Sequence, residues 1–113
     1  MDMQPLIDPE RIDEITQGRA ELLRRFTALL QETLDDSTPD LGHPDLAVRS
    51  LAAHRLKGAS ANMGAVGLWR LFQRLEENPA AFDDATQEVL SDVRARTVAA
   101  LLAQASALEA PEI

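Results

Sequence analysis

Apolar side chains recur every three or four residues along most of this chain, which is the spacing of amphipathic α-helices. The clearest pattern in the first third of the chain runs from Arg19 to about Asp36. Its apolar positions are Leu22, Leu23, Phe26, Leu29, Leu30 and Leu34. Because these side chains share one face of a helix, we expect them to form part of a hydrophobic core.

A shorter helix is predicted before this one. Asp8 is followed directly by Pro9, and an aspartate N-cap before a proline at the first helical position favours a helix start. This helix is expected to end near Gly18. Residues 1–7 precede it without a helical pattern, and we expect them to be loose.

Three further helices follow residues 37–44, whose prolines and glycine predict a loop. The helices are predicted from Asp45 to Met63 or Gly64, from Val66 to Asn78, and from Phe82 or Asp83 towards Ala110. A chain of 113 residues fits one domain. We therefore predict an all-α fold with a single domain over residues 1–113. Its core is an antiparallel four-helix bundle over about residues 19–110, with a short extra N-terminal helix.

The third predicted helix has an unusual outer face. A core stripe is formed by Val48, Ala52, Leu56, Ala59 and Met63. At about 100° per residue, His54 points roughly 160° away from the middle of this stripe. Lys57 lies one turn further along the same outer face.

Small residues surround His54 and Lys57 on this helix. They are Ala47, Ser50, Ala53, Gly58 and Ala61. A glycine inside a helix costs about 1 kcal/mol relative to alanine, so its presence needs a reason. Close approach by another molecule is the simplest reason, and we therefore expect a docking face around His54.

Charge is distributed unevenly along the chain. The formal net charge is −8, which argues against a nucleic-acid partner. Residues 46–75, however, hold five basic and no acidic residues, while the rest of the chain holds six basic and nineteen acidic ones. This local excess predicts a positive surface near His54 that attracts an acidic protein surface or a phosphoryl group.

Composition limits the other possibilities. Without cysteine, the chain can form no disulfide and no thiolate metal site, and its two histidines are far apart in sequence. No window approaches the roughly 18 apolar residues of a membrane span, and we expect no membrane partner and a cytoplasmic location. His43 lies in the predicted loop and is expected to be an ordinary solvated residue.

The residues on the third helix resemble the signature of histidine-containing phosphotransfer (HPt) domains of two-component phosphorelays. The matching positions are His54, Leu56, Lys57, Gly58, Ser60 and Gly64. The following segment, residues 68–76, is similar to the next helix of that family. The resemblance is sharpest over residues 52–77, and it implies the same four-helix bundle.

The resemblance also implies a chemistry. His54 would accept a phosphoryl group at Nε2, while Glu76 on the next helix would take the Nδ1 proton and fix the tautomer. Lys57 would neutralise phosphoryl oxygens, and Gly58 would let a receiver domain lie against the helix. The expected docking surface also includes Ser50, Arg55, Ser60, Ala61 and Gly64.

Partners must supply what the chain lacks. It contains no glycine-rich phosphate loop and no nucleotide-binding pattern, so we expect a phosphocarrier and not an autonomous enzyme. The phosphoryl group would come from a response-regulator receiver domain or a hybrid histidine kinase. No cofactor is expected on the chain itself, and Mg²⁺ is expected on the partner receiver. The family likeness implies a monomer.

Two alternatives stay open at this stage. A non-phosphorylated four-helix adaptor that binds a receiver or another regulator would share the fold and the positive surface, but it would not need His54. A hydrolase with His54 as base is disfavoured, because no serine or aspartate stands in a recognisable triad pattern and a flat face is no substrate pocket. Trp69 is predicted either to pack in the core or to contact a partner.

Overall fold

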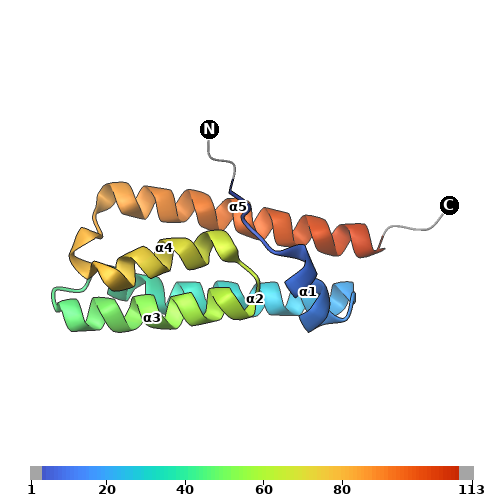
Figure 1. The fold of residues 1–113 in the computed structure, drawn as a ribbon, viewed down its shortest axis with the longest axis horizontal. Coiled ribbons are helices and arrows are strands. Elements are labelled where there is room, and N and C mark those ends of the chain that lie inside the picture. Colours follow the sequence, from blue (N-terminus) through green and yellow to red (C-terminus); the bar gives the residue numbers. More distant parts are fainter. Residues whose placement is uncertain (1–3, 110–113) are drawn as a thin grey trace.

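The protein is a bundle of helices in the computed structural model, which describes residues 4–109. Four long helices run nearly along one axis, and a short helix lies at one end (Figure 1). The helices are α1 Pro9–Thr16, α2 Ala20–Ser37, α3 Leu46–Asn62, α4 Val66–Glu77 and α5 Asp84–Glu109. No strand occurs in residues 4–109, so the prediction of an all-α bundle with an extra N-terminal helix is confirmed.

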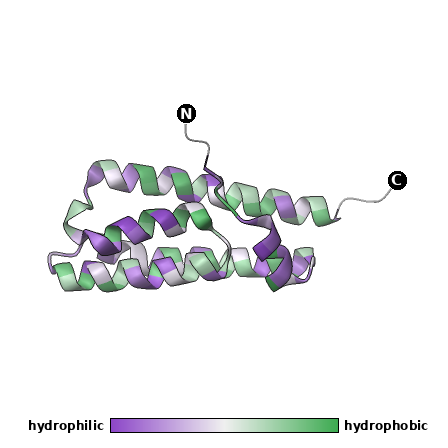
Figure 2. Ribbon diagram, in the orientation of Figure 1, coloured by the Kyte–Doolittle hydropathy of each residue, from purple (hydrophilic) through white to green (hydrophobic). Residues whose placement is uncertain are grey.

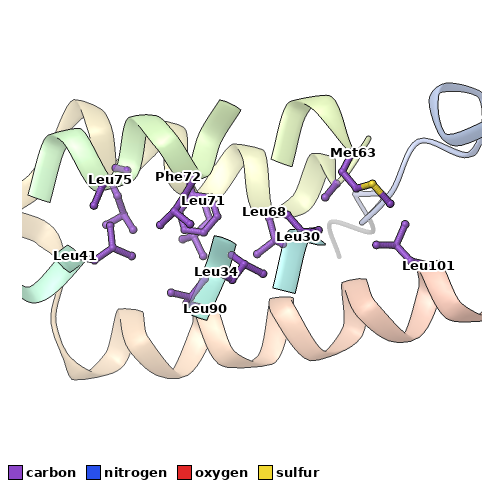
Figure 3. Packing of buried hydrophobic residues seen from close by; sticks show 14 of the residues in the cluster. Leu30, Leu34, Leu41, Met63, Leu68, Leu71, Phe72, Leu75, Leu90 and Leu101 are labelled. Carbon is purple, nitrogen blue, oxygen red and sulfur yellow. The ribbon is translucent and has the colours of Figure 1, made fainter. Parts of the chain in front are cut away.

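Each long helix turns apolar side chains towards a shared core. Figure 2 shows hydrophobic and hydrophilic residues alternating along the helices at helical spacing. Leu34 of α2, Phe72 of α4 and Leu90 of α5 point into the space between these helices (Figure 3). Burial of one such side chain stabilises the fold by about 1.5–3 kcal/mol, so the amphipathic pattern is sufficient to drive the bundle together.

The connection between α2 and α3 differs from the predicted loop. Residues Thr38–Gly42 form a 3-10 helix, and Leu41 within it is buried in the core. A proline at the second position of this short helix is compatible with the turn, because the proline N–H is not needed there. The prolines and glycine thus mark the end of α2, but the segment that contains them still packs against the core.

The N-terminal segment is also ordered where the structure describes it. The Gly67 N–H donates to the Leu6 carbonyl at 3.1 Å, and Arg70 donates to the Pro5 carbonyl at 2.6 Å. A Cβ at Gly67 would lie 3.0 Å from the Leu6 side chain, so the glycine permits this close approach. The expectation of a loose terminus is therefore wrong for residues 4–7, while residues 1–3 lie outside the described part.

Helix α1 is fastened to the turn between α3 and α4. Asp8 caps it by accepting from the Arg11 N–H at 3.2 Å, and the Asp8 N–H donates to the Gly64 carbonyl at 2.8 Å. Gly64 adopts φ +71°, and a Cβ there would lie 3.2 Å from buried Ile12. Gly64 therefore serves the packing of α1, and its predicted place on the docking surface is wrong.

Leu29, which was expected in the core, is exposed, and so are two leucines of α5. Leu29 on α2 borders a surface groove between α2 and α3. The C-terminal part of α5 extends past the start of α4 (Figure 1), and Leu102 and Leu108 of α5 are exposed. Because α4 does not cover this part of α5, helical periodicity alone overestimates how much of α5 is buried. None of the helices within residues 4–109 has the length and apolarity needed to cross a membrane.

Candidate functional site

His54 lies in the middle of α3 and faces solvent. Asp45 starts this helix by accepting from the Ala47 N–H at 2.9 Å, and the buried side chains of Ala52 and Leu56 hold its inner face. The His54 side chain is 64% exposed. The prediction that His54 points away from the core is therefore confirmed.

The side of α3 that faces α4 is lined by small buried residues. Ala53 and Ser60 have no exposed surface, and the Ser60 hydroxyl donates to the Leu56 carbonyl at 2.8 Å. Small side chains let two helices approach closely, which explains why these positions are small. Ala53 therefore does not belong to the outer face, and the predicted docking role of Ser60 is wrong.

This close packing brings Glu76 of α4 to His54. Glu76 Oε1 lies 2.9 Å from His54 Nδ1, and Glu76 Oε2 lies 2.6 Å from Lys57 Nζ. The carboxylate thus bridges two residues that sit one turn apart on α3. The Glu76 and Lys57 side chains are only 26% and 23% exposed, so the bridge is mostly covered while the His54 ring is not.

The charges in this bridge fix the protons. The Lys57 ammonium, and next to it the hydrogen bond from His54, lower the pKa of the Glu76 carboxyl below its usual value. Glu76 is therefore ionised at neutral pH and can only accept hydrogen bonds. A neutral His54 ring must then carry its proton on Nδ1 to donate to Glu76, which leaves a lone pair on Nε2.

The surface beside His54 combines small residues with exposed apolar ones. Gly58 is exposed, and a Cβ there would meet nothing within 4 Å. Arg55 and Ala61 are exposed as well, and Ser50 is half-buried. Leu51, which is 52% exposed, lies one turn before His54. Sequence reasoning did not single out Leu51, although its position outside the core stripe already places it on the outer face of α3.

A groove of about 580 Å³ continues this surface between α2 and α3, where α1 also borders it. Its lining includes Arg11, Phe26, Leu29, Thr33, Ala59 and Asn62. Leu29 is 50% exposed at its edge. The outer side of α3 therefore offers apolar contact area on the side of His54 that faces away from Glu76.

The basic residues around His54 divide into two groups. Arg49 donates to the carbonyls of His43 and Pro79, and Arg70 donates to the Pro5 carbonyl. These two arginines fasten neighbouring segments to α3 and α4. Arg55, the neighbour of His54 on α3, is exposed and supplies positive charge there, and Arg74 on α4 is exposed as well.

The remaining sequence candidates lie outside this site. His43 is exposed beside the start of α3, where its Nδ1 accepts from the Asp45 N–H at 2.9 Å. Trp69 on α4 is 38% exposed, so its ring is partly packed and partly available to solvent. Within residues 4–109 no three His, Asp or Glu side chains are grouped as metal ligands.

Comparison with known protein families agrees with this geometry. The family model described as the Hpt domain matches residues 21–110, which include all of α3, α4 and α5. Searches of curated proteins and of solved structures gave no match to the chain. Since the family model matches most of the sequence, the chain belongs to the Hpt domain family.

Proposed function

We propose that this protein carries a phosphoryl group on His54 in a two-component phosphorelay. The group would arrive from a receiver-domain aspartate or a histidine kinase, and it would leave to a receiver-domain aspartate. The observation that carries the proposal is the 2.9 Å contact between Nδ1 of an exposed histidine and the Glu76 carboxylate. This contact presents the Nε2 lone pair to solvent, where a partner can approach it.

The transfer step is a displacement at phosphorus. The Nε2 lone pair forms a bond to the phosphorus of an aspartyl phosphate while the bond from phosphorus to the aspartate oxygen breaks, and the aspartate leaves as a carboxylate. The proton on Nδ1 stays in place, so the phosphorylated ring is cationic. Glu76 then faces a positive ring and stabilises it more strongly than the neutral one.

The partner would supply the rest of the phosphoryl environment. Receiver domains bring the aspartate and Mg²⁺, and the positive side chains of Arg55 and Lys57 would favour their acidic surface. Gly58 and Ala61 leave room beside His54, and exposed Leu51 offers apolar contact. We expect the carrier to act as a monomer, in the cytoplasm where such partners are found, and without a cofactor or kinase activity of its own.

The test is to incubate the protein with a panel of receiver domains that carry radiolabelled aspartyl phosphate. We expect label to move onto this protein from at least one receiver, and the label to be lost in acid and stable in base, as phosphohistidine is. A protein that binds the receivers and acquires no label would be an adaptor, and the proposal would be wrong. Base-labile label would also contradict it, because that would indicate another acceptor.

A further inference from the structure

Lys57 makes a contact that its expected role as a phosphate neutraliser does not explain. Its Nζ lies 2.6 Å from Glu76 Oε2, the oxygen that does not face His54. This oxygen is buried, and within residues 4–109 no donor is aligned with it as a hydrogen bond. The Lys57 ammonium is therefore the charge that compensates a buried carboxylate oxygen.

Removal of this ammonium would move Glu76. A carboxylate oxygen that is buried without a counter-charge is destabilised by its lost hydration. The Glu76 side chain is 26% exposed, so it can rotate towards water and recover hydration. Such a rotation would also withdraw Oε1 from His54 Nδ1, because both oxygens belong to one rigid group.

We propose that Lys57 is a positioning residue, whose ion pair with Glu76 Oε2 holds Oε1 against His54 Nδ1 and keeps the accepting Nε2 free of its proton. The inference rests on the proposed function and deepens it. It assigns Lys57 an effect in the unphosphorylated protein, before any phosphoryl group is present. Lys57 lowers the pKa of Glu76 more than His54 does, which agrees with Lys57 being the main partner of this carboxylate.

The first test observes the His54 ring without any transfer reaction. Imidazole nitrogen chemical shifts distinguish the two neutral tautomers when they are recorded at about pH 8, above the usual histidine pKa of about 6.5. We expect the parent to carry the proton on Nδ1. In Lys57→Met, which keeps much of the aliphatic stem, a substantial population should carry it on Nε2.

Arg74→Met is the matched control, because it removes one positive charge from α4 while, among residues 4–109, Arg74 forms no hydrogen bond or ion pair with Glu76. It should leave the His54 tautomer unchanged. An unchanged tautomer in Lys57→Met, or an equal shift in both variants, would overturn the proposal. The tautomer can be measured even if no receiver phosphorylates the protein. A failure of the Lys57 proposal is therefore distinguishable from a failure of the proposed function.

The second test is a double-mutant cycle on the rate of phosphoryl acceptance. Loss of a residue that orients a reactive group typically costs about 10- to 100-fold, and we expect Lys57→Met to slow acceptance about tenfold in the parent. In a Glu76→Gln background the same change should slow it less than about twofold, because the ion pair is already gone. Equal slowing in both backgrounds would show that Lys57 acts on the phosphoryl group directly.

Discussion

His43 and His54 are both exposed histidines of the α3 region, but their surroundings place the ring proton on opposite nitrogens. His43 accepts from the Asp45 N–H at Nδ1, so its neutral ring carries the proton on Nε2. His54 faces the Glu76 carboxylate at Nδ1, so its neutral ring carries the proton there. Only His54 presents an Nε2 lone pair to solvent.

The contrast shows that exposure alone does not make a histidine a phosphoryl acceptor. The group opposite Nδ1 decides which nitrogen is nucleophilic, and that group differs between the two sites. At His43 the group opposite Nδ1 is the backbone N–H of Asp45, two residues away. Such a contact is available to any histidine just before a helix. At His54 the group is an ionised side chain that a second helix must deliver.

The largest expected difference between the two sites is in phosphoryl acceptance. His54→Gln should fold normally and accept no label from phosphorylated receivers, because an amide has no nucleophilic lone pair of comparable strength. His43→Gln should accept label at the parent rate. The measurement is label transfer with circular dichroism as the check of folding. Label on His54→Gln, or its loss from His43→Gln, would contradict the assignment.

The next effect concerns the bare surface beside His54. Gly58→Arg should lower the rate of acceptance about 100-fold, because a long side chain next to the accepting ring displaces a docked partner by more than the about 1 Å that transfer tolerates. The bundle should remain folded, since arginine favours helix and a Cβ at this position meets nothing within 4 Å. Stopped-flow or quenched label transfer measures the rate.

Gly58→Ala is the matched control for this change. It adds only a methyl group in open space, so transfer should stay within a few-fold of the parent. The free energy of unfolding should rise by about 1 kcal/mol, because alanine is the better helix former. Urea unfolding measures this gain. If Gly58→Arg transfers normally, close docking is not the reason for the glycine.

The smallest expected effect is the pH dependence of stability that Glu76 introduces. Its pKa is lowered in the folded protein, so the ionised carboxylate stabilises the fold above its unfolded-state pKa of about 4.3. This contribution is lost as the pH falls through the lower folded-state pKa. The stability difference between the parent and Glu76→Gln should therefore be present near neutral pH and disappear in acid.

Urea unfolding of both proteins at about pH 7 and about pH 3 tests this expectation. Lys57→Met should reduce the pH-dependent part of the difference, because Lys57 contributes most to the lowered pKa. A difference that is the same at both pH values would show that Glu76 stabilises the protein by packing and not by charge.

Much of the fold was predictable, because amphipathic periodicity and helix caps are local signals. Asp8 and Asp45 cap α1 and α3, and the main helices end within a few residues of the predicted positions. The burial of Leu41 and the contacts of Leu6 depend on segments distant in the sequence. Local patterns contain no information about such neighbours.

The inner face of α3 shows why the site was predicted less well. With a turn of about 100° per residue, the centre of the buried face of α3 lies roughly 50° around the helix axis from the centre of the predicted stripe. The observed buried face is turned towards α4. Ala53 and Ser60 therefore meet a helix of the same chain, although their small size was attributed to an external partner. Composition cannot distinguish close approach within a chain from close approach by another molecule.

Glu76 was identified only through the family resemblance, and its contact with His54 is present in the structure. No spacing rule would have chosen it over Glu77, its neighbour on α4. Its bridge to Lys57 was not predicted, because the resemblance assigned the two residues separate roles. The pairing depends on the side-chain geometry of two packed helices.

Because α1 packs against Gly64, the stretch of chain that folds together is longer than the stretch that matches the family. The family match begins at residue 21, yet Ile12 of α1 is fully buried and belongs to the hydrophobic core. A fragment that begins at residue 21 would keep His54, Lys57 and Glu76, but it would lose α1, which covers one end of the bundle. Domain limits drawn from similarity would thus remove Ile12 from this core and uncover the turn at Gly64 against which α1 packs.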